Sequence, residues 1–154
     1  MPHLATYVAL ADRSEQTLAE SFRAVGEGHA QHPDVLFTCR TLAGMSDEHV
    51  RRLAPMAKRY GEDNEVAEPE RLHAAGLAEV RSGPVGLLRD LQDLYVLAGL
   101  VQTTWTVVAQ GAQGLRDDDL LAVAEAANAD TSRQLAWLNT RMKVAAPQAL
   151  IVAE

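Results

Sequence analysis

Residues 87–110, LLRDLQDLYVLAGLVQTTWTVVAQ, indicate the fold class of this chain more clearly than any other stretch. Apolar side chains recur there at steps of three and four residues, which places them on one face of a helix. That face comprises Leu87, Leu91, Leu94, Ala98, Val101, Trp105 and Val108. From Tyr95 to Val108 the segment is apolar on nearly every side. It therefore predicts either the most buried helix of the protein or a helix that faces a second subunit.

Three further segments show the same helical spacing, and no segment alternates with the period of a strand. They run from Leu4 to Val25, from Leu36 to Met56 and from Leu121 to Met142, the last ending at Pro147. Residues 61–83 are polar and charged, and their length suits a crossover between distant helix ends. The sequence predicts an all-α fold, an antiparallel four-helix bundle formed by one domain over residues 1–154, with a long connection between the second and third helices.

The composition excludes several classes of partner. With 154 residues and 47% hydrophobic content, the chain can bury a full core. Its net charge of −7 argues against nucleic acid and against an anionic membrane surface as partners. No apolar run reaches the roughly 18 residues of a membrane span, and no basic residue precedes the first apolar stretch. We expect a cytoplasmic protein whose lone Cys39 is a small buried side chain.

Residues 45–53, MSDEHVRRL, raise the question of a metal site. Two-metal sites in four-helix bundles take one carboxylate from each of two helices and a Glu-x-x-His motif from each of the others. His49 stands at the histidine position of such a motif, but Ser46 replaces its glutamate. Counting about 16 residues to either side of the turn near Pro33 brings Glu20 level with His49. The sequence therefore predicts that Glu20 and His49 approach each other inside the bundle.

The other two helices offer few further ligands. Ala98 stands near the expected height on the third helix, and Asp130-x-x-Arg133 on the fourth ends in an arginine, which does not bind metals. Two or three ligands are too few for a di-iron centre, so we expect no di-metal site and no cofactor. One interpretation makes His49 a core histidine bonded to a carboxylate such as Glu20. The other makes the pair a residual site for iron or manganese.

Two other groups of polar residues have simpler interpretations. His29 and His32 lie in the predicted turn, where we expect solvated side chains. Gln102, Asn128 and Thr131 interrupt the apolar stripes of the third and fourth helices. A buried polar network that fixes the register of these helices would account for them.

Residues 33–53, PDVLFTCRTLAGMSDEHVRRL, resemble the second helix of ferritin-like and rubrerythrin-like proteins, which carries Glu-x-x-His after a short turn. Residues 87–121 and 133–150 are similar to an actinobacterial-type branch of that superfamily. The resemblance covers most of the chain and implies a ferritin-like fold, with Glu20 and His49 at ligand positions. Four positions differ from the family's ligand set: Ser46, Ala98, Asp130 and Arg133.

Two functions are compatible with these features. The first is a non-catalytic ferritin-like protein with a lost di-iron site that acts as an assembly or partner-binding module. The incomplete ligand set and the apolar third helix favour it. The alternative is a ferritin-like protein that binds iron or manganese through Glu20 and His49 and has an oxidase or iron-handling role. The sequence leaves open whether the protein is an enzyme and favours the non-enzymatic function.

The apolar residues outside the buried stripe of the third helix bear on assembly. They are Tyr95, Leu97, Leu100 and Val107. Residues 146–154, APQALIVAE, predict an extended apolar tail after Pro147, which could fold back over this helix but is too short to cover it. We therefore expect a homodimer in which two third helices pack about a two-fold axis. A monomer with a docked tail is the alternative.

Overall fold

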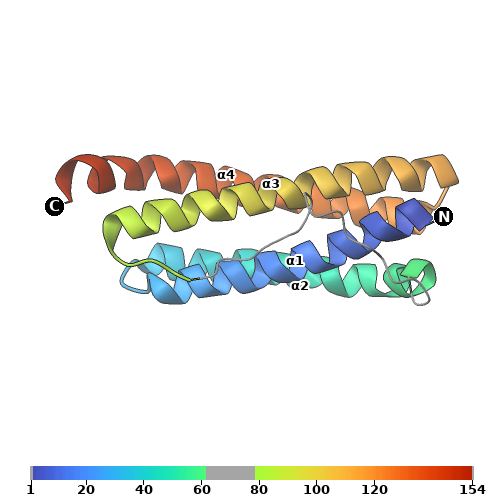
Figure 1. Ribbon diagram of the computed structural model, residues 1–154, viewed down its shortest axis with the longest axis horizontal. Helices are drawn as coiled ribbons and strands as arrows, with labels where there is room; N and C mark the ends of the chain where they lie inside the picture. The colour runs from blue at the N-terminus through green and yellow to red at the C-terminus, as the bar shows by residue number, and fades with distance from the viewer. Residues whose placement is uncertain (1, 62–78, 154) are drawn as a thin grey trace.

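The computed structural model describes residues 2–61 and 79–153 (Figure 1). Its helices are α1 (Pro2–Gly28), α2 (Pro33–Gly61), α3 (Gly83–Leu115) and α4 (Asp118–Pro147), followed by the short π-helix η2 (Gln148–Val152). No strand occurs within these described ranges, so the prediction of an all-α protein built on four long helices is confirmed. The predicted long connection lies mostly outside the described residues.

The four long helices lie side by side along the long axis of the molecule (Figure 1). In that view the chain runs from right to left along α1 and α4, and from left to right along α2 and α3. α1 packs against α2 and α3, and α4 packs against α3 and α2. Each helix therefore has two neighbours and turns one face to a shared core. None of the described helices has the combination of length and hydropathy needed to cross a bilayer.

The core consists of the apolar faces that the helical spacing predicts. All seven residues of the predicted α3 face are buried, and Trp105 and Phe22 are among the largest fully enclosed side chains. Cys39 is also fully buried, as expected. Burial, followed by the nearby charge of Asp34, raises the pKa of its thiol to about 12. Of the α3 residues expected outside the buried face, Tyr95 and Val107 are exposed, whereas Leu97 is buried and Leu100 half-buried.

Asp117 joins the end of α2 to the start of α4. Its carboxylate caps α4 by accepting a hydrogen bond from the backbone N–H of Leu120 at 3.1 Å. It also accepts bonds from Tyr60 and Arg59 at the end of α2. Burial alone would raise the pKa of Asp117, but these hydrogen bonds and the charge of Arg59 outweigh it and lower the pKa. The Asp117 carboxylate therefore holds the end of α2 beside the start of α4.

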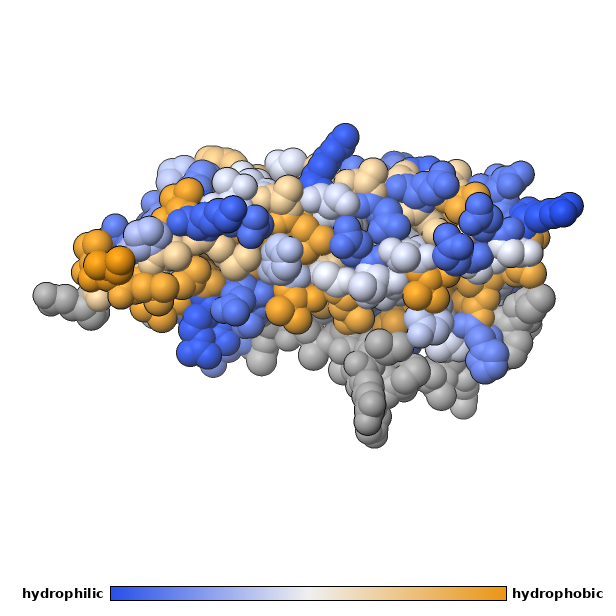
Figure 2. Space-filling model, turned by 90° about the horizontal axis from the view of Figure 1, so that it is seen from above, coloured by the Kyte–Doolittle hydropathy of each residue, from blue (hydrophilic) through white to orange (hydrophobic). Residues whose placement is uncertain are grey.

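The prediction of an extended tail after Pro147 is wrong, although these residues do pack against α3. α4 continues through Pro147, and residues 148–152 form a π-helical turn at its end (Figure 1). Proline removes one backbone donor and its ring displaces a carbonyl in the preceding turn, but its φ of −60° is a helical value. Beyond Pro147 the chain makes one wider π turn, closed by a bond from the Ala153 N–H to the Gln148 carbonyl at 2.9 Å. Leu150, Ile151 and Val152 lie in this turn and are exposed, and apolar surface gathers at that end of the molecule (Figure 2).

Candidate functional site

A cluster of polar side chains lies at the centre of the bundle, with one member from each long helix. Nδ1 of His49 on α2 is hydrogen-bonded to Oε2 of Glu15 on α1. On its other edge, Nε2 of His49 lies 2.8 Å from Oδ2 of Asp130 on α4. Trp105 on α3 donates its indole N–H to the same Glu15 oxygen at 3.2 Å. Glu15, His49 and Trp105 are buried and Asp130 is 29% exposed, so the cluster reaches solvent only at its α4 side.

Glu20 does not take part in this cluster, and its predicted pairing with His49 is wrong. Glu20 is exposed, whereas Glu15 occupies the place next to His49. The residue count located the right part of α1 but not the right face. Glu15 shares the buried face with Ala11, Leu18 and Phe22 at steps of four, three and four residues, and Glu20 falls between those positions. Helical phase was therefore the signal that could have identified Glu15.

The two carboxylate contacts of His49 favour its doubly protonated form. An ionised carboxylate only accepts hydrogen bonds, so an imidazole that bonds a carboxylate at each nitrogen needs a proton on both. Burial by itself would lower the pKa of His49. The hydrogen bond and charge of Glu15, followed by those of Asp130, outweigh burial and raise the pKa above its ordinary value. The geometry of the cluster therefore favours a buried imidazolium at His49.

This raised pKa predicts how stability depends on pH. Since folding favours protonated His49, its contribution is fully present below the unfolded pKa of about 6.5 and is lost as pH rises through the folded pKa. We expect NMR titration of the native protein to find His49 protonated at pH 7. Asp130→Asn should lower the pKa of His49. The denaturant midpoint of this variant should then decrease less than that of the native protein as the pH rises above about 7. A His49 midpoint at or below about 6.5 would contradict the assignment.

Ser46 and Gln134 form a second polar layer beside the cluster. Both side chains are buried, and the Gln134 amide donates to the Ser46 hydroxyl and to the Leu42 carbonyl, each at 3.0 Å. The network predicted from Gln102, Asn128 and Thr131 does not form. Thr131 bonds within its own helix, Gln102 bonds Ser132 near the surface, and Asn128 Oδ1 has no partner among the described residues. Ser46 therefore belongs to an interhelical contact rather than to a ligand set.

The donor set does not fit two metal ions. Glu15 and Asp130 lie on opposite edges of the His49 ring, so they cannot join one of its nitrogens around a common ion. Trp105 is the α3 member, and its N–H can donate but not ligate. Among residues 2–61 and 79–153, no three His, Cys, Asp or Glu side chains gather in a metal-binding arrangement. Glu20, on which the iron or manganese alternative depends, lies outside this core.

A second buried polar contact lies at the end of the bundle where α1 ends and α2 begins. The prediction that His29 is a solvated turn residue is wrong, because His29 is fully buried and its Nε2 lies 2.8 Å from Oδ2 of Asp90. Asp90 also accepts bonds from the backbone N–H and the guanidinium of Arg81 at 3.0 and 2.8 Å. The chain before α3 can pack this closely because residue 28 is a glycine. A Cβ at that position would lie only 2.4 Å from Cγ1 of Val80. The covering segment lies about fifty residues along the chain, which explains why the local sequence did not reveal it.

Comparison of the chain with protein-family models, with curated proteins and with solved structures found no match. The functional interpretation therefore rests on the geometry of the central cluster and on the surface of the bundle. Both features can be tested in the isolated protein.

Proposed function

We propose that the chain is a ferritin-like, antiparallel four-helix protein that acts as an assembly or partner-binding module and performs no di-iron chemistry. The helix directions and packing support the fold assignment. The pairs α1–α2 and α3–α4 run in opposite directions, as do the packed pairs α1–α3 and α2–α4 (Figure 1). A long crossover between α2 and α3 is the connection that such an arrangement requires.

The observation that carries the proposal is the engagement of both ring nitrogens of His49 by carboxylates. A histidine ligand must offer a metal one unprotonated nitrogen. Here each nitrogen that could serve is engaged by a carboxylate of the protein, and the raised pKa of His49 opposes loss of a proton. Metal binding would have to break one of these buried contacts. The centre of the bundle is therefore suited to hold four helices together rather than to bind a di-iron pair.

The outer face of α3 supports the assembly role. From Leu94 to Leu115 this helix carries no charged residue, although one side of it faces solvent. Val96 is 69% exposed and Val107 47% exposed, and with Thr103 between them they share one face of the helix. An uncharged helical face of this length is typical of an interface. We propose that it pairs with the same face of a second copy about a two-fold axis.

Light scattering coupled to size exclusion tests this role. At micromolar concentration the native chain should have the mass of a dimer, and Val96→Glu should give a monomer because it places two like charges at the two-fold contact. Phe37→Glu is the matched control, since Phe37 is 60% exposed but lies on α2, and it should leave the mass unchanged. A native chain that stays a monomer on concentration would contradict the proposed dimer.

A further inference from the structure

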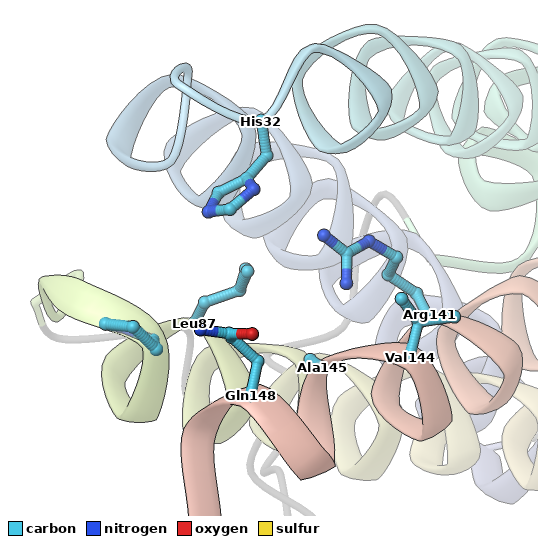
Figure 3. Close-up of a pocket in the computed structure, with 7 residues that line it drawn as sticks. His32, Leu87, Arg141, Val144, Ala145 and Gln148 are labelled. Atoms are coloured by element: carbon cyan, nitrogen blue, oxygen red, sulfur yellow. The ribbon is translucent and has the colours of Figure 1, made fainter. Parts of the chain in front are cut away.

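A pocket of about 220 Å³ opens at the end of the bundle where α2 begins and α4 ends (Figure 3). Three parts of the chain line it. His32 lies just before α2, Pro84 and Leu87 lie in the first turns of α3, and the remaining residues lie at the end of α4 and in η2. Those residues are Arg141, Val144, Ala145 and Gln148. The pocket shares no residue with the His49 cluster and has its own donors.

Arg141 supplies the charge of this pocket. Its side chain is only 11% exposed, and its Nε donates to Asp34 at 2.7 Å. A guanidinium has five N–H donors, yet its two terminal nitrogens have no acceptor within hydrogen-bond distance among the described residues. Figure 3 shows the guanidinium turned toward His32 across the opening, with Leu87 and Gln148 below. Asp34 pairs with Nε alone, so the terminal N–H groups remain free to bind an anion in the pocket.

The rest of the lining limits the kind of anion. Leu87 and Ala145 are buried apolar side chains, and Pro84 and Val144 extend this apolar surface to the opening. Phosphate binds best where several charged donors converge. Here one guanidinium, with His32 and Gln148 as the other polar lining residues, faces an apolar floor and suits a single carboxylate with an apolar body. A cavity of about 150 Å³ can hold benzene, so the larger space here accommodates a six-membered ring with a carboxylate.

We propose that this pocket binds a small monocarboxylate with an apolar body. The carboxylate accepts from the terminal nitrogens of Arg141, and the apolar body contacts Leu87 and Ala145. Such a ligand contacts the start of α3 and the end of α4 together. Its binding therefore stabilises two helix ends at once and raises the thermal midpoint of the protein. This inference is independent of the proposed assembly role and of the α3 surface.

Calorimetric titration with benzoate tests the charge preference, with benzyl alcohol as the uncharged analogue and inorganic phosphate as the polar anion. Benzoate should bind at least about tenfold more tightly than either, because it alone satisfies both the guanidinium and the apolar floor. On the native chain, benzoate should shift the NMR signals of Leu87, Val144 and Ala145. Absence of saturable benzoate binding, equal affinity for benzyl alcohol, or shifts confined to other residues would overturn the proposal.

A pair of arginine variants tests the assigned donor. Arg141→Met keeps most of the apolar stem and should weaken benzoate binding about 10- to 100-fold. Arg23→Met is the matched control because Arg23 also pairs with an aspartate, Asp47, but lies on an open surface and lines no part of the pocket. It should leave the affinity unchanged. Unchanged binding by a folded Arg141→Met protein would overturn the assignment, and if that variant does not fold, the signal shifts in the native chain decide the matter.

Discussion

Replacement of His49 by alanine is expected to lower the free energy of unfolding by about 3–5 kcal/mol. The loss follows from Glu15, whose side chain is fully buried and would keep only the bond from Trp105. One oxygen of this carboxylate already lacks a partner among the described residues, so removal of the imidazolium leaves a buried charge with little compensation. Urea denaturation of the native and variant proteins at pH 7 measures the difference.

Glu20→Gln is the matched control for this experiment. Glu20 is the residue that sequence counting places opposite His49, but it is exposed, so its replacement should change stability by less than about 0.5 kcal/mol. Adding Glu15→Gln to His49→Ala should recover part of the lost stability, since an amide costs less to bury than an unpaired carboxylate. Equal losses from His49→Ala and Glu20→Gln would contradict the assigned pairing.

Asp90→Ala is expected to have an effect of similar size, about 3–5 kcal/mol. Asp90 is fully buried and binds His29, which is also fully buried, together with Arg81 just before α3. Its removal leaves the His29 imidazole without its partner and frees the segment that covers this end of the bundle. Thermal or urea unfolding gives the magnitude. NMR signals from residues 79–82 should change as well, because their backbone loses an anchor.

Asp93→Ala provides the comparison within the same cluster. Asp93 binds the same Arg81 nitrogen at the same 2.8 Å distance, but it is 43% exposed. Exposed ion pairs contribute about 0–1 kcal/mol, so this variant should stay close to the native stability. If Asp93→Ala destabilised the protein as much as Asp90→Ala, burial would not be the source of the effect, and the interpretation of the cluster would be wrong.

The helices were predictable because their information is local. Steps of three and four residues fixed the buried face of α3, and the glycines and Pro33 marked the turn between α1 and α2. Pro147 was misread because a proline ends most helices, whereas here a π-helical turn follows it. Local rules state what a residue prefers. They do not include tertiary packing, which can hold a residue in a less common conformation.

The central cluster was predictable only in part because it depends on how four helices are rotated about their axes. His49 was identified from its motif, and its burial against a carboxylate of the first helix was expected. Glu15 was missed because the residue count considered only the position along the helix axis and not the side of the helix on which each residue lies. Asp130 was dismissed as a metal ligand because Arg133 follows it, yet it is the partner of His49 Nε2. A pairing between side chains 81 positions apart is set by tertiary packing, which a single sequence does not encode in any local pattern.

Anaerobic titration with ferrous iron, followed by desalting and elemental analysis, tests the central claim most directly. The claim is that an imidazolium held by Glu15 and Asp130 occupies the centre of the bundle, where the proposed ferritin-like fold would place a two-metal site. Protein purified without an affinity tag should retain far less than one iron per chain, and His49→Ala should not change that value. Retention of about two iron atoms per chain, lost in a folded His49→Ala variant, would contradict the account.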